Sequence, residues 1–456
     1  MRVNEQFKYL NIGLPDRIAR KKTFGDFQGA VRMIDDELAA GKGSPAYQAC
    51  LRVQRELILR LARDYPYTFE EAVAFAQKSV PDFTPQEMEE LERTGRVDWI
   101  YINGVPHYFN RFLENLFETD HSYLKRAGIL PQGGDPDNFA RRHALFEEQR
   151  EKGSVAHRIR VKATLRMNDD VFRPGVRVLA HLPIPADCAE QSDIRIERVF
   201  PETGSPDRED APQRTISWQE VMTENHPFEV EYSYIYRARF TDAWNARADA
   251  EQPDFFTGEQ APHIMFTPYI RDLTAMLTEG AADNLEKARR IYDFVTQNVK
   301  YSFSRIYFGL ESIAETCARN LVGDCGIQTL LFITLCRCAG VPARWESGLA
   351  VGPDATGAHD WCKVYAALLG WFPVDLSRGG SAFARGDETL RQYYFGNLEG
   401  DRMVANREFQ TEFGVPKEHW RCDPYDNQLG EMETEDRGLL YDEFVRSKEL
   451  LAYEKL

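Results

Sequence analysis

The sequence lacks any long apolar run. No stretch of its 456 residues approaches the roughly eighteen consecutive apolar residues that a membrane-spanning helix needs. The N-terminal stretch MRVNEQFKYLNIGLPDRIARKK also has no continuous apolar segment of the kind that forms the core of a secretory signal. These two absences predict a cytoplasmic protein without a membrane partner.

The sequence also lacks a disulfide pattern, an excess of positive charge and a metal-binding motif. Its eight cysteines show no framework spacing, which favours reduced thiols. Lys and Arg total 56 against 72 Asp and Glu, a net charge of −16, so we expect no nucleic-acid partner. A zinc site from Cys336, Cys338, Cys362 and a histidine is disfavoured, because C-x-C side chains diverge by about 200° around a helix. We therefore expect neither a metal nor a cofactor.

What is present predicts a folded chain of several parts. Hydrophobic residues make up 43% and aromatic residues 12%, and 456 residues correspond to two or three domains. Residues 1–150 are predicted to be mainly helical, with capping signals at Thr68 with Glu71 and at Thr84-Pro85 with Glu87. The Asn103-Gly104 pair predicts a β-hairpin inside this helical region.

The middle of the chain changes to an alternating pattern. Residues 151–245 are predicted to form an all-β, sandwich-like domain. Its row Tyr232, Tyr234 and Tyr236 is interpreted as an exposed or interface-facing stripe, with a carbohydrate or peptide platform as the alternative. Residues 246–265 are predicted to be a linker and residues 266–456 a third domain, which ends in an amphipathic helix or frayed segment over Leu439–Leu456.

Residues 323–377 carry the pattern that points to chemistry. Asp324 is a natural N-cap for an apolar helix that ends at Gly340, and Cys325 falls in the first turn of that helix. The partial positive charge at a helix N-terminus favours a thiolate and should lower the pKa of this cysteine. The free amides there can also stabilise an oxyanion. Cys325 is therefore a candidate nucleophile.

A base and its orienting carboxylate follow Cys325 in the chain. His359 begins an alternating strand 34 residues after Cys325, and Asp375 ends a second strand 16 residues later. If the two strands form a hairpin, the histidine and the aspartate become opposite or diagonal neighbours. A carboxylate in that position fixes the imidazole tautomer and stabilises the imidazolium. The pattern thus predicts a Cys325, His359, Asp375 triad.

The motifs GDC, CRCAGVPAR, HDWCKVY and GWFPVDLS resemble the transglutaminase-like superfamily, whose core is related to papain-like cysteine proteases. The resemblance covers Phe266 to about Ser377. It implies an α+β fold in which a nucleophile helix packs on an antiparallel sheet, and it gives Cys325, His359 and Asp375 the roles of nucleophile, base and third member. Lys363 departs from the family, which commonly has an acidic residue there.

The expected reaction is acyl transfer at an amide through a thioester on Cys325. The oxyanion donors would be the Cys325 backbone amide and one of three side chains, Tyr301, Tyr307 or Gln328. Hydrolysis as a peptidase or amidase is favoured, because no calcium-type acidic cluster stands out. A protein-glutamine transglutaminase that uses an amine acceptor is the first alternative, and a catalytically silent binding or assembly module is the second. The substrate class is a peptide, a protein or a small amide, and the oligomeric state stays open.

Overall fold

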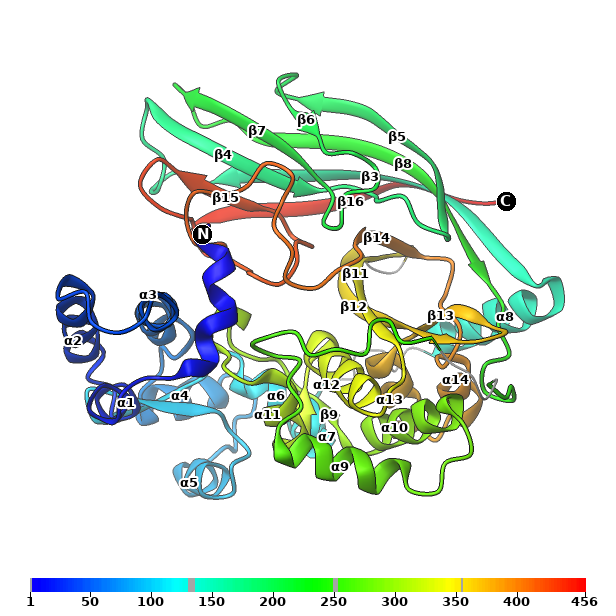
Figure 1. The fold of residues 1–456 in the computed structure, drawn as a ribbon, viewed down its shortest axis with the longest axis horizontal. Helices are drawn as coiled ribbons and strands as arrows, with labels where there is room; N and C mark the ends of the chain where they lie inside the picture. Colours follow the sequence, from blue (N-terminus) through cyan, green and yellow to red (C-terminus); the bar gives the residue numbers. More distant parts are fainter. Residues whose placement is uncertain (1, 130–135, 249–252, 354–355) are drawn as a thin grey trace.

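A computed structural model of the chain describes residues 2–129, 136–248, 253–353 and 356–456. It has helices on one side and two stacked antiparallel sheets on the other, with a smaller four-stranded sheet between them (Figure 1). All eight cysteines are free. Within the described ranges, no helix combines the length and the apolar character needed to cross a membrane. The predicted α+β class is confirmed.

The N-terminal region is helical, and its predicted start signals are confirmed. Thr68 and Glu71 form a capping box, and the Thr84 side chain accepts from the backbone N–H of Glu87. The Asn103-Gly104 pair turns the predicted hairpin. The elements are η1 (Asn4–Ile12), α1 (Asp16–Thr23), α2 (Phe27–Ala39), α3 (Pro45–Leu61), η2 (Ala62–Asp64), α4 (Phe69–Gln77), α5 (Pro85–Arg93), β1 (Trp99–Ile102), β2 (Val105–Tyr108), α6 (Phe112–Thr119), α7 (His121–Ala127) and α8 (Pro136–Lys152).

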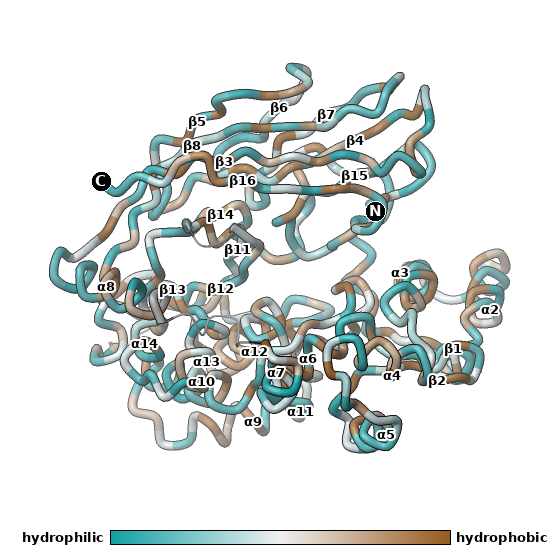
Figure 2. The backbone as a smooth tube through the Cα atoms, turned by 180° about the vertical axis from the view of Figure 1, so that it is seen from behind, coloured by the Kyte–Doolittle hydropathy of each residue, from teal (hydrophilic) through white to brown (hydrophobic). Residues whose placement is uncertain are grey.

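The β-rich middle of the chain, together with two strands from near its end, forms the two stacked sheets. Their strand orders are β16-β3-β8-β5 and β15-β4-β7-β6. Hydrophobic and hydrophilic stretches alternate along these strands (Figure 2). The strands are β3 (Ser154–Met167), β4 (Val176–Pro183), β5 (Gln191–Phe200), β6 (Ser205–Pro206), β7 (Thr215–Met222), β8 (Phe228–Arg239), β15 (Glu431–Thr434) and β16 (Phe444–Lys455).

Of two expectations about these sheets, one is wrong and one is right in part. The end of the chain is not a helix, because β16 pairs with β3 along almost its whole length. The three tyrosines of β8, Tyr232, Tyr234 and Tyr236, face an interface, as one of the two interpretations expected, because they are buried in a core that includes Trp361 of β12 (Thr356–Ala366); they are neither exposed nor available as a platform. The chain therefore returns to the sandwich after passing through the third region.

The third region surrounds the four-stranded sheet β13-β12-β11-β14. Its elements are α9 (Pro268–Thr278), α10 (Asn284–Asn298), β9 (Lys300–Tyr301), η3 (Tyr307–Gly309), α11 (Ile313–Asn320), β10 (Val322–Gly323), α12 (Cys325–Cys338), β11 (Ala343–Val351), β12 (Thr356–Ala366), β13 (Gly370–Val374), α13 (Leu376–Ala384), α14 (Glu388–Tyr393) and β14 (Arg402–Asn406).

This sheet is covered on both faces. Cys362 and Val364 of β12 belong to the same hydrophobic core as the buried residues of α12. Trp361, which directly precedes Cys362 in the strand, belongs to the core of the β-sandwich. Side chains alternate between the two faces of a strand, so one face of β12 meets the helix and the other meets the sandwich. The predicted domain boundaries at 150, 245 and 265 stay a prediction.

Candidate active site

Helix α12 begins where the sequence predicts. The Asp324 side chain caps it by accepting from the backbone N–H of Ile327 at 3.0 Å, and the first helical residue is Cys325. Gly340 follows the helix with a φ of 75°, a conformation that glycine adopts without strain. Cys325 itself is half-buried. The helix therefore presents one partly accessible thiol at its N-terminal end.

The hairpin of β12 and β13 brings His359 and Asp375 together. Cys362 lies opposite Val374 in the register, so Asp375 is a diagonal neighbour of His359, as predicted. The Nε2–H of His359 donates to Asp375 Oδ2 at 2.8 Å. The other oxygen of Asp375 caps α13 by accepting from the backbone N–H of Arg378 at 3.0 Å. Asp375 thus has a structural role and an orienting role at once.

Arg402 of β14 completes this group of charges. It is fully buried, and its Nη2 donates to Asp375 Oδ2 at 2.9 Å and to Glu399 at 2.7 Å. Burial alone would raise the pKa of Asp375, but His359 and Arg402 together hold this pKa at about 2. Burial lowers the pKa of His359 despite the opposing attraction of Asp375. The pair therefore consists of a neutral imidazole and an ionised carboxylate.

The thiol of Cys325 has a partner that the sequence did not predict. It donates to Asp360 Oδ2 at 3.2 Å. Asp360 follows His359 directly, so alternation puts Asp360 on the α12 side of β12 and His359 on the side of Trp361. The His359 and Trp361 rings are 6.2 Å apart. The structure thus joins His359 to Asp375, and Cys325 to Asp360.

One signal in the sequence could have revealed this partner. Asp360 belongs to the same alternating row as Cys362 and Val364, which face an apolar helix. A carboxylate in such a row requires a polar partner on that helix. Cys325, the first residue of that helix, could have been identified as this partner.

The expected lowering of the thiol pKa is reversed in the structure. Burial raises the pKa of Cys325 well above its ordinary value, and the nearby Asp360 and Asp324 raise it further. The helix terminus favours the thiolate, but its contribution is smaller than the cost of desolvating a charged sulfur beside two carboxyl groups. In this arrangement the cysteine is a protonated thiol.

Asp360 is held in place by a polar network. Gln428 Nε2 donates to Asp360 Oδ1 at 2.5 Å and to the backbone oxygen of His359 at 2.9 Å. Burial, followed by repulsion from Asp426 and Asp324, raises the pKa of Asp360 well above its usual range. The hydroxyl of Ser347 donates to Asp426 at 2.5 Å. Gln428 therefore couples the position of Asp360 to the backbone that carries His359.

The predicted oxyanion donors have different surroundings. In the described part of the chain, the backbone N–H of Cys325 has no acceptor. The hydroxyl of Tyr307 already donates to Asp324, and Gln328 Nε2 donates to the backbone oxygen of Gly323 at 2.8 Å. The Tyr301 ring packs edge-on against Phe303, with 5.4 Å between the ring centroids. Tyr307 and Gln328 are thus already used in supporting the start of α12.

The described side chains around Cys325 do not form a metal-binding cluster. Across the ranges that the structure describes, no three His, Cys, Asp or Glu side chains are grouped as ligands for a metal ion. Cys336 and Cys362 are buried in the apolar core of α12 and β12. The polar side chains near Cys325 are instead bonded to one another.

The family of this core is given by a sequence comparison. Residues 271–376 match the family model described as Transglutaminase-like superfamily. This range contains Cys325, His359 and Asp375, so this part of the chain is a transglutaminase-like core. An uncharacterised protein of Haemophilus influenzae is 22% identical over 176 residues, which are 32% of this chain and 48% of that protein. The chain thus spans about half the length of the curated relative it matches.

A comparison with solved structures also gave matches. A crystal structure described as a "Putative Cysteine Protease" from Cytophaga hutchinsonii is 13% identical and covers 66% of this chain and 91% of its own, with a TM-score of 0.39. The periplasmic domain of TgpA from Pseudomonas aeruginosa is also 13% identical and covers 55% of this chain and 96% of its own, with a TM-score of 0.27. The family match defines the class of the core.

Proposed function

We propose that this protein is a cysteine-nucleophile acyl-transfer enzyme that acts on an amide bond. The observation that carries the proposal is the hydrogen-bonded pair of His359 and Asp375, on a strand whose next residue contacts the thiol of Cys325. A neutral imidazole with its Nε2 held by a carboxylate keeps Nδ1 as a proton acceptor. This is the arrangement that a general base beside a thiol requires.

The reaction begins with transfer of the thiol proton from Cys325 to His359 Nδ1. The thiolate attacks the amide carbon, and the resulting oxyanion accepts a hydrogen bond from the free backbone N–H of Cys325. The imidazolium then protonates the leaving amine as the carbon–nitrogen bond breaks, which leaves a thioester on Cys325. Water, deprotonated by His359, attacks this thioester, releases the acid and returns the proton to the sulfur.

The hydrogen bond between Cys325 and Asp360 describes a resting state of this site. The thiol is protonated there and directed at a carboxyl group rather than at the imidazole. In the proposed reaction the thiol exchanges Asp360 for His359, and because the His359 side chain points to the other face of β12 in the structure, this exchange requires the imidazole or its strand to move. We therefore assign Asp360 to the resting site and His359 to the reacting one.

A peptide-cleavage assay tests the proposal. The full chain is incubated with a mixed peptide library, with and without a dansylated primary amine, and mass spectrometry records new peptide termini and amine-labelled glutamines. We expect new termini with the wild type and none with Cys325→Ala. Amine-labelled glutamines without cleavage would replace hydrolysis by transamidation. Identical products from wild type and Cys325→Ala would remove Cys325 as nucleophile, and absence of both products would favour the silent binding module.

A further inference from the structure

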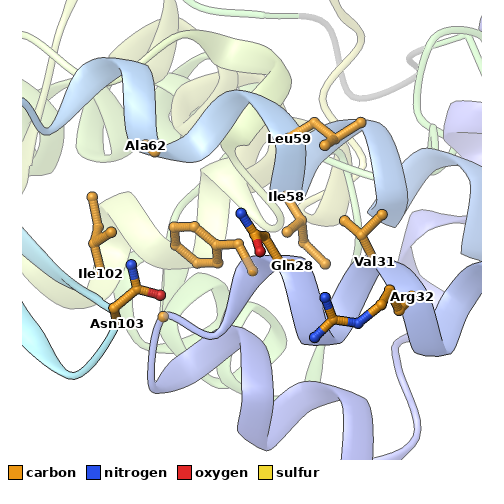
Figure 3. Close-up of a pocket in the computed structure, with 10 residues that line it drawn as sticks. Gln28, Val31, Arg32, Ile58, Leu59, Ala62, Ile102 and Asn103 are labelled. Carbon is orange, nitrogen blue, oxygen red and sulfur yellow. The ribbon is translucent and has the colours of Figure 1, made fainter.

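A second site lies between the N-terminal helices and the transglutaminase-like core. An open cavity of about 860 Å³ is lined by residues of η1, α1, α3, the β1–β2 hairpin and the segments around Met265 and Arg305. A neighbouring cavity of about 480 Å³ has Phe27 in common with it. Figure 3 shows the residues that line this neighbour. Gln28 and Val31 of α2, Ile58 and Leu59 of α3 and Asn103 of the hairpin line this neighbour. Cys325, His359 and Asp375 line neither cavity.

The larger cavity is mainly apolar, with one polar edge. Leu14, Trp99, Tyr101 and Met265 are among its apolar and aromatic lining residues. Cavities with this composition, at the junction of two parts of a fold, are the usual places where small organic molecules bind. A few charged groups on such a wall then decide which molecule is accepted.

One charge on the polar edge is compensated within the protein. Lys22 Nζ donates to Glu311 Oε1 at 2.7 Å, and Gln54 Nε2 donates to the same oxygen at 2.7 Å. Lys22 also donates to Gln54 Oε1 at 3.0 Å. These three side chains therefore satisfy one another and leave no net charge at their position.

The other cation on the wall has no such partner. The Arg305 guanidinium lies 5.5 Å from the centre of the Tyr65 ring, and in the described part of the chain it forms neither a hydrogen bond nor an ion pair. Asp98, Asp64 and Glu311 attract its charge without a hydrogen bond, and each accepts from another group. Asp64 accepts from the backbone N–H of Ile306 at 2.9 Å, and Asp98 from the hydroxyl of Tyr65 at 2.6 Å. A half-buried guanidinium thus keeps its donors for a ligand.

We propose that this cavity binds a small organic carboxylate with an aromatic or aliphatic body. The carboxylate accepts hydrogen bonds from Arg305, whose planar fork matches two carboxylate oxygens. The body of the ligand fills the space beside Trp99, Tyr101 and Leu14 and removes their apolar surface from water. This site is separate from the triad, and its occupation does not depend on the proposed reaction.

Isothermal titration calorimetry on the full chain tests the site with two probes that share one apolar body, phenylbutyrate and phenylbutylamine. We expect wild type to bind one phenylbutyrate per chain and to bind phenylbutylamine about tenfold or more weakly, because only the carboxylate pairs with Arg305. Arg305→Gln should remove this difference, and Arg305→Lys should keep part of it. Arg208→Gln, at a side chain that is 85% exposed, is the matched control and should bind as wild type does.

Three results would overturn the proposal: no saturable binding of phenylbutyrate to wild type, equal binding of both probes, or unchanged preference in Arg305→Gln. Thermal unfolding of each variant checks that the fold is retained. If Arg305→Gln fails to fold, Leu14→Trp provides the second test, since it fills the cavity and keeps the guanidinium. It should abolish phenylbutyrate binding, and wild-type affinity in that variant would contradict the assigned location.

Discussion

The thiol of Cys325 donates to Asp360 across 3.2 Å, while the residue that precedes Asp360 in the chain, His359, is bonded to Asp375. Of two successive residues of β12, one thus holds the sulfur in the structure, and the other is the acceptor that the proposed reaction requires. One is a carboxyl group that stabilises the protonated thiol, and the other is an imidazole able to accept its proton. The competition between these partners gives a direct prediction.

Replacing Asp360 by Asn should make Cys325 more reactive. Burial is the first cause of the raised thiol pKa and Asp360 is the second, so removal of this acidic group should lower the pKa. We expect alkylation of Cys325 by iodoacetamide at pH 7 to become about tenfold faster in Asp360→Asn, because the thiolate is the reacting form. Peptide mapping by mass spectrometry measures the rate at this residue. Cys325→Ser is the control, and an unchanged or slower rate would contradict the resting-state role of Asp360.

The residue after Cys325, Gly326, should tolerate no side chain. A Cβ atom at Gly326 would meet the hydroxyl of Tyr307 and lie 2.9 Å from Asp360 Oδ2. Both groups are fixed by other hydrogen bonds, so Gly326→Ala should displace the start of α12 and lower peptide cleavage about tenfold or more. Gly357→Ala, where a Cβ meets open space, is the matched control. Full cleavage by Gly326→Ala would show that this contact is not critical.

The lysine that departs from the family pattern should be important for stability. Lys363 is 2% exposed, and its Nζ lies 2.6 Å from Glu190 and 3.2 Å from Glu346, so it joins the sandwich to the sheet β13-β12-β11-β14. Lys363→Met leaves two carboxylates without their cation and should cost about 3–5 kcal/mol in the free energy of unfolding.

Urea unfolding measures this cost, and a second Lys–Glu pair is the control. Lys162 and Glu229 form a more exposed pair at 2.9 Å. Lys162→Met should therefore cost less than about 1 kcal/mol. Equal losses of unfolding free energy in the two variants would show that burial does not increase the contribution of the Lys363 pair to stability.

Two buried histidines predict how stability depends on pH. Burial lowers the pKa of His181 and of His263 from 6.5 to about 3. At a pH between these two pKa values, the histidines of the unfolded chain bind protons and those of the folded chain do not. The free energy of unfolding should therefore fall as the pH drops below about 6.5. Guanidinium unfolding at pH 7 and pH 5 measures this change. His181→Gln should reduce the difference between the two midpoints, and a midpoint that rises at pH 5 would contradict the argument.

The elements that local signals determine could be predicted from the sequence. Asp324 marked the start of α12, Gly340 its end, and the pattern around His359 and Asp375 gave the hairpin that joins them. Each of these features depends on residues close together in the chain. These local signals identify both partners of the His359–Asp375 hydrogen bond before any tertiary structure is known.

The rest depended on contacts between distant segments. Strand β16 looked amphipathic in a way that also suits a helix, and its partner β3 lies almost three hundred residues earlier. The tyrosines of β8 are buried because a second sheet covers them, which no local pattern shows. Asp360 was missed because its role follows from the face of β12 that meets α12. The thiol pKa was predicted in the wrong direction for the same reason, since burial is a tertiary property.

Intact-protein mass spectrometry after acid quench tests the central claim most directly. The full chain is mixed with the peptide library and quenched within seconds, and any covalent adduct is mapped to a residue. The account predicts an acyl group on Cys325 in wild type, and its loss in His359→Gln, because the thiol then has no base. Peptide cleavage without an adduct on Cys325, together with undiminished cleavage by Cys325→Ala, would contradict it.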